Sequence, residues 1–65
     1  MSNQDRANHI IKELNNNEEL ISAGIWGVPL SLKQKFDLLQ EMKKLAKEYE
    51  QLTGNRVPGR DALYT

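Results

Sequence analysis

His9 is the only histidine of the chain, and no cysteine is present. Histidine and cysteine supply most structural zinc ligands and many catalytic bases and nucleophiles in proteins. We expect no carboxylate, cysteine or second histidine to accompany His9 at the spacing that a metal site or a catalytic base requires. The sequence therefore predicts a solvent-facing or half-buried histidine without a chemical role.

The other candidates for chemistry have simpler structural explanations. Glu18 and Glu19 are adjacent in the chain, and neighbours on a helix point about 100° apart, so their carboxylates do not converge easily on one substrate atom. The glycines at 24 and 27 lack the Lys-Ser/Thr pair of a phosphate-binding loop. The three serines fit helix caps or helix ends. We therefore expect no enzymatic activity, no cofactor and no metal.

Length and composition limit the chain to one small domain. It has 65 residues, of which nine are acidic and nine basic, so neither a disordered nor a strongly basic nucleic-acid-binding composition is indicated. A domain of this size buries only about 60% of its unfolded surface. Without cysteines for disulfides, oligomerisation or a stable partner is the expected remedy. No segment has the pattern of a membrane span or a signal peptide, so we expect a cytoplasmic protein.

The segment 31–53 has the strongest helical pattern. Ser31 and Gln34 have the spacing of a capping box at its start, and Gly54 follows its end. Apolar residues form two adjacent rows that cover almost half of the circumference: Leu32, Phe36, Leu39, Met42 and Ala46 in one, and Leu38, Leu45, Tyr49 and Leu52 in the other. This width is typical of a core helix in a small bundle. The seven-residue repeat in the second row also allows packing against a helix of another chain.

The rest of the chain completes the prediction of an all-α fold, a small bundle of two to three helices in which the C-terminal helix is dominant. Residues 3–15 have the apolar spacing of a first helix. The asparagines at 15–17 are expected to end it, and a short second helix is expected at 18–23. Residues 24–30 form a hydrophobic connector, in which Gly27 permits a sharp turn and Pro29 disfavours helix.

Two segments leave alternatives open. Trp26 in the connector either fills the gap between the helices or is exposed as an anchor for a partner, since tryptophan is favoured at interface hot spots. We assign residues 1–53 to one helical domain and residues 54–65 to an irregular C-terminal tail. The tail is mobile, folds back over the bundle, or docks on a partner as an extended segment.

We expect a small non-enzymatic protein–protein interaction module. It would be a regulator or inhibitor that binds a larger protein through helical apolar surface, and it would form a homodimer. The wide apolar arc, the tryptophan in the connector and the neutral charge support this hypothesis. The candidate partner-binding residues are large apolar side chains of the long helix, the connector and the tail: Trp26, Phe36, Met42, Tyr49, Leu63 and Tyr64.

The alternative is a DNA-binding regulator of the helix-turn-helix type, since three helices with a short second one are compatible with that fold. The segment 31–53 would be the recognition helix. The candidate nucleic-acid contacts are Lys33, Gln34, Lys35, Lys43, Lys44, Lys47, Arg56 and Arg60. We favour the interaction module, because Leu32 and Phe36 occupy the helix turn that would have to face the DNA.

Overall fold

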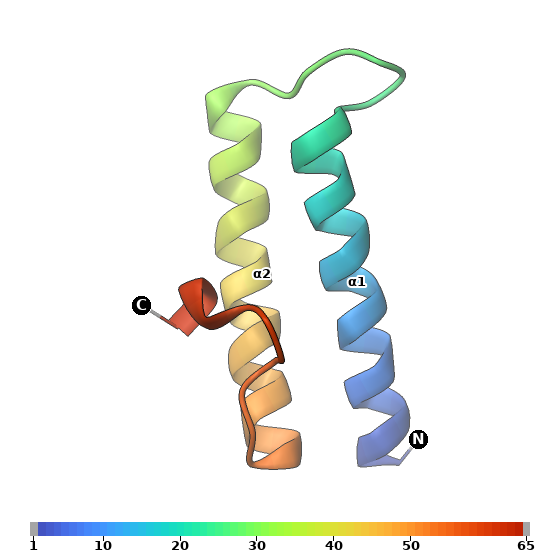
Figure 1. The fold of residues 1–65 in the computed structure, drawn as a ribbon, viewed down its shortest axis with the longest axis vertical. Coiled ribbons are helices and arrows are strands. Elements are labelled where there is room, and N and C mark those ends of the chain that lie inside the picture. The colour runs from blue at the N-terminus through green and yellow to red at the C-terminus, as the bar shows by residue number, and fades with distance from the viewer. Residues whose placement is uncertain (1, 65) are drawn as a thin grey trace.

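The computed structural model describes residues 2–64 and shows two antiparallel helices of nearly equal length (Figure 1). Helix α1 spans Asn3–Ala23, and helix α2 spans Leu32–Thr53. The chain then turns back along α2 to a short 3-10 helix, η1, at Asp61–Tyr64. The all-α prediction is confirmed, but the predicted dominance of the C-terminal helix is wrong, because α1 has 21 residues and α2 has 22.

Helix α1 runs through the asparagines at 15–17, so the predicted break and the separate second helix at 18–23 are wrong. Asparagine costs a helix at most about 0.7 kcal/mol per residue relative to alanine. Leu14 is buried just before the asparagines, and Ile21 packs against the core seven residues later. The apolar side of α1 therefore continues across this segment, and its packing on α2 outweighs the local preference of asparagine for turns.

The ends of α2 are those that the sequence predicts. The Ser31 hydroxyl accepts a hydrogen bond from the Gln34 N–H at 3.2 Å, and the Gln34 side chain accepts one from the Ser31 N–H at 2.9 Å. These two reciprocal bonds form a capping box. Gly54 ends the helix in the left-handed conformation, with φ 75° and ψ 5°.

The connector contains a tight turn whose two central residues, Trp26 and Gly27, both have positive φ, of 55° and 77°. Ile25 and Val28 exchange two backbone hydrogen bonds across the turn, at 3.0 and 2.9 Å. Positive φ at both central positions is the pattern of a type I′ turn, which asparagine and glycine favour. Gly24 lies against the same turn, since a Cβ at this position would approach the Val28 carbonyl oxygen to 2.1 Å.

The main core lies in the half of the hairpin that is remote from the connector, where the tail forms a third layer. Its buried side chains come from α1, α2 and the tail: Ala7, Ile10, Leu14, Met42, Leu45, Ala46, Val57 and Leu63. The Tyr64 hydroxyl donates to the Ala46 carbonyl oxygen and accepts from the Val57 N–H, both at 2.9 Å. Of the three alternatives for the tail, the structure has the one in which it folds back over the helices.

An ion pair between Arg6 of α1 and Glu48 of α2 links the two helices. Arg6 Nε lies 2.5 Å from Glu48 Oε2, and Arg6 Nη2 lies 2.9 Å from Glu48 Oε1. This hydrogen-bonded guanidinium holds the pKa of the Glu48 carboxyl below its usual value. Both side chains are more than one-third exposed, at 37% and 39%, so water screens the pair.

The Glu48→Gln substitution should lower the melting temperature at neutral pH but not at acid pH. Because folding lowers the pKa of Glu48, the stabilisation is present above the unfolded-state value, near 4.5, and is lost as the pH falls through the lower folded-state value. Calorimetric melts from neutral to acid pH should show the Tm difference from wild type shrinking in this range. Glu41→Gln removes another carboxylate from α2 and is the control. A Glu48→Gln difference that is independent of pH would show that the carboxylate charge does not stabilise the fold.

Candidate protein-binding surface

The large apolar side chains that remain exposed in the described chain all come from residues 25–39. They belong to the connector and to the first half of α2: Ile25, Trp26, Val28, Leu32, Phe36 and Leu39. We call these six residues the hairpin-end surface, because they belong to the connector and to the turns of α2 that follow it. Their exposed side-chain area is on the order of 600 Å², as large as the largest apolar patch of a typical monomer.

The tail explains why half of this apolar row is exposed. Leu32, Phe36 and Leu39 lie in the same row of α2 as Met42 and Ala46. The tail packs on the C-terminal half of α2 and buries Met42 and Ala46, but it does not extend to the connector end (Figure 1). The first half of the row therefore keeps its apolar side chains in contact with solvent, and Leu32 is 85% exposed.

An ion pair fixes the tail against α1. The Arg60 guanidinium contacts the Glu18 carboxylate and donates to the Asn15 side-chain oxygen at 2.6 Å. The Arg60 side chain is only 18% exposed. These polar contacts attach the tail, which packs on α2, to α1 as well.

Trp26 is the most exposed residue of the hairpin-end surface. It is 97% exposed and has a φ of 55°, which is the left-handed region. Left-handed backbone costs a residue other than glycine or asparagine about 1–2 kcal/mol. The indole does not fill the gap between the helices, so the first of the two alternatives for Trp26 is not the one in the structure.

The structure separates the predicted partner-binding residues into two groups. Trp26 and Phe36 are exposed on the hairpin-end surface. The others belong to the core or pack against it: Met42 and Leu63 are buried, and Tyr49 and Tyr64 are half-buried. Partner binding by any of them stays a prediction. The sequence places Leu32 and Leu39 on the apolar row but does not mark them as binding residues, because the point at which the tail stops depends on the three-dimensional fold.

The predicted nucleic-acid contacts do not form one free basic surface. Arg60 is bound to Glu18 and Asn15, while Arg56 lies 3.7 Å from Glu50 and 5.1 Å from the Tyr64 ring. Lys43, Lys44 and Lys47, with Gln40, line a hollow of about 480 Å³ beside Leu63 and Tyr64. Lys33 and Gln34 are exposed at the start of α2, and Lys35 is half-buried. The three-helix arrangement on which the DNA-binding alternative rested is absent from residues 2–64.

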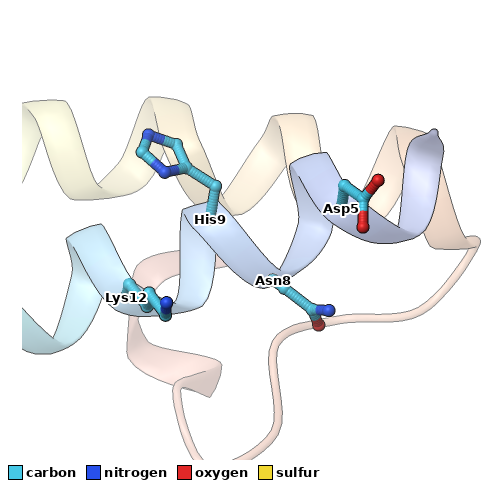
Figure 2. Close-up of a pocket in the computed structure, with 4 residues that line it drawn as sticks. All are labelled: Asp5, Asn8, His9 and Lys12. Atoms are coloured by element: carbon cyan, nitrogen blue, oxygen red, sulfur yellow. The ribbon is translucent and has the colours of Figure 1, made fainter. Parts of the chain in front are cut away.

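A second hollow, of about 360 Å³, lies on the outer side of α1 and is lined by Asp5, Asn8, His9 and Lys12 (Figure 2). All four side chains come from one helix and point in different directions, so no second wall encloses a ligand.

The expectation that no carboxylate accompanies His9 is wrong, because His9 Nε2 lies 2.9 Å from Glu13 Oε1. The i,i+4 spacing of the two residues was the signal for this pair. The described residues contain no group of three or more side chains that could hold a metal ion, and none of their helices is long and apolar enough to cross a bilayer.

Comparison of the chain with protein-family models, with curated proteins and with solved structures gives no significant match.

Proposed function

We propose that this chain is a small non-catalytic protein–protein interaction module that regulates or inhibits a larger protein by covering part of its surface. The hairpin-end surface would make the contact, with the Trp26 indole as its anchor. The observation that supports this proposal best is the state of Trp26, which is 97% exposed in a left-handed backbone conformation.

Both features of Trp26 are unfavourable for the isolated chain. An exposed indole leaves a large apolar surface in water, and the left-handed backbone adds strain. Neither feature helps the chain to fold, since asparagine would fit the same turn position better. A binding partner that buries the indole would remove this apolar surface from water and recover the free energy that its exposure costs. Tryptophan is also among the residues most enriched at the energetic centre of protein interfaces.

The turn that carries Trp26 is held in shape before binding. The two hydrogen bonds between Ile25 and Val28 close it, and Gly24 packs against the Val28 carbonyl. An anchor on a constrained turn loses less conformational entropy on binding than one on a flexible loop. The connector is therefore suited to insert one aromatic side chain into a pocket of a larger protein.

The Trp26→Asn substitution should stabilise the fold by about 1 kcal/mol, because asparagine followed by glycine is the preferred pair in a type I′ turn. Trp26→Phe keeps the strained backbone and should change the free energy of unfolding by less than about 0.5 kcal/mol. Urea unfolding followed by circular dichroism measures both values. A loss of more than about 1 kcal/mol in Trp26→Asn would show that the indole supports the fold and would remove the main argument for an anchor.

The binding role itself can be tested by photo-cross-linking in the cells that naturally produce the protein. A photoreactive phenylalanine at position 26 should form a covalent adduct with a larger protein. The same group in place of Gln51, which is exposed on α2 outside the hairpin-end surface, should form none. Excess wild-type chain should suppress the adduct, and excess Trp26→Asn chain should not. Equal labelling from both positions, or none from either, would contradict the proposal.

A further inference from the structure

We infer that the first half of α2 is also a surface for self-association, and that two copies of this chain pack there as an antiparallel, two-fold symmetric pair. The contact residues on each copy are Leu32, Phe36 and Leu39. This inference goes beyond the proposed function. It assigns Leu32, Phe36 and Leu39 of the hairpin-end surface to a second copy, which leaves Trp26 of the connector as the proposed anchor for a larger protein.

The spacing of the three residues is self-complementary. They occur at i, i+4 and i+7, so they form one line on the helix surface with Phe36 near its middle. In a two-fold interface the same patch is used on both copies. An antiparallel arrangement centred near Phe36 brings Leu32 of one copy against Leu39 of the other and the two phenylalanines against each other. The pair would then have three apolar contacts across the interface: Leu32 with Leu39, Phe36 with Phe36, and Leu39 with Leu32.

The position of the tail selects the antiparallel arrangement. The tail thickens only the C-terminal half of the α2 face (Figure 1). In a parallel pair the two tails would meet and hold the exposed halves of α2 apart. In an antiparallel pair each tail lies beyond the contact, toward the connector of the other copy, and the two exposed halves can approach closely.

The exposed area on α2 fits a small interface, below the standard size. The accessible surface of the chain is 4832 Å² for a mass of 7.5 kDa, whereas a compact monomer of that mass has about 4,200 Å². The excess of roughly 600 Å² is close to the exposed area of all six hairpin-end residues, and Leu32, Phe36 and Leu39 supply about half of it. The contact on α2 is therefore smaller than the roughly 800 Å² that each partner buries in a standard interface, and it fits a weak dimer. A second copy on α2 would cover the part of this excess that Leu32, Phe36 and Leu39 expose.

Charges at the edges of the row are compatible with this pairing. Lys33 and Asp37 are exposed on one edge, and the antiparallel arrangement places Lys33 of each copy near Asp37 of the other. Lys35 lies on the other edge, close to the two-fold axis, and gives one like-charge pair. Exposed pairs contribute at most about 1 kcal/mol each, so the apolar contact dominates the association.

Sedimentation equilibrium of the full chain, from about 1 µM to about 500 µM, tests the inference, and we expect a dimer with a Kd on the order of 10 µM. Phe36→Glu should raise the Kd at least about 100-fold, because it places two carboxylates at the symmetry axis. Its circular dichroism should stay helical, since Phe36 is 60% exposed in the monomer. Gln51→Glu adds the same charge elsewhere on α2 and should leave the Kd within about threefold. A wild-type monomer at every concentration, or equal weakening by both variants, would overturn the inference.

Cross-linking tests the orientation, since the chain has no cysteine of its own. Under a mild oxidant, Phe36→Cys should form a disulfide-linked dimer rapidly. A mixture of Leu32→Cys and Leu39→Cys should form the mixed disulfide faster than either symmetric one, and Lys44→Cys should cross-link much more slowly. Preferred self-linking of Leu32→Cys would indicate a parallel pair and would contradict the arrangement. These results are independent of whether position 26 labels a larger protein, so the two proposals can fail separately.

Discussion

The Leu45→Asp protein is expected to lack a cooperative unfolding transition at room temperature. Leu45 is buried in the core between α1, α2 and the tail. No basic side chain is among the buried residues of the described chain, so the new carboxylate would lie in apolar surroundings without a partner. This substitution should cost more than about 4 kcal/mol, which is about the whole stability that a single core of this size supplies.

Leu32→Asp is the matched control for this prediction. It makes the same chemical change in the same helix, but at a position that is 85% exposed. An aspartate in the first turn of a helix also interacts favourably with the helix dipole. We expect the monomer to keep its unfolding free energy within about 0.5 kcal/mol. Far-ultraviolet circular dichroism with urea titration measures both variants. Equal free energies of unfolding for Leu45→Asp and wild type would refute the placement of Leu45 in the core.

Removal of residues 56–65 is the second change with a large expected effect. The truncated chain loses Val57, which is 1% exposed, and Leu63, which is 6% exposed. Full burial of such side chains contributes about 1.5–3 kcal/mol each, and their removal also exposes Met42 and Ala46. We expect the two remaining helices to lose cooperative unfolding, because a helical hairpin of this length has too little core by itself.

Point substitutions in the tail separate the effect of lost side-chain packing from the effect of shortening the chain. Leu63→Ala should lower the free energy of unfolding by about 2–3 kcal/mol, and Asp61→Ala, at an exposed position of η1, by less than about 0.5 kcal/mol. The same urea titrations give these values. A truncated chain with the stability of the full protein would mean that the tail does not contribute to the core.

Local signals in the sequence are sufficient to predict the two ends of α2. Ser31, Gln34 and Gly54 act through hydrogen bonds and backbone preferences within a few residues, so their types alone indicate the caps. The asparagines at 15–17 give a wrong prediction for the opposite reason. Their preference for turns is weak, and it is outweighed by contacts between α1 and α2 that no local pattern reveals.

The candidate surface was only partly predictable. The periodicity of α2 indicates its apolar row, and the sequence leaves Trp26 as either buried or exposed. The state of Trp26 depends on the backbone of the connector turn, and the part of the row that stays exposed depends on where the tail lies. Val57 and Leu63 are separated by a turn and show no helical periodicity with each other, so their joint burial could not be read from spacing. Without it, the exposed part of the row could not be separated from the buried part.

The uneven distribution of the core implies that the two ends of the hairpin differ in their free energy of local unfolding. Of residues 18–41, only Leu30 is buried, whereas the opposite end of the hairpin is held by side chains from both helices and the tail. Segments with few buried contacts undergo local unfolding at lower free energy and lose amide hydrogen-exchange protection first. The amides near the connector should therefore exchange faster than those around Leu14 and Leu45. The end that carries the exposed tryptophan would then be the adaptable end of the molecule, and the end with the tail would be its rigid base.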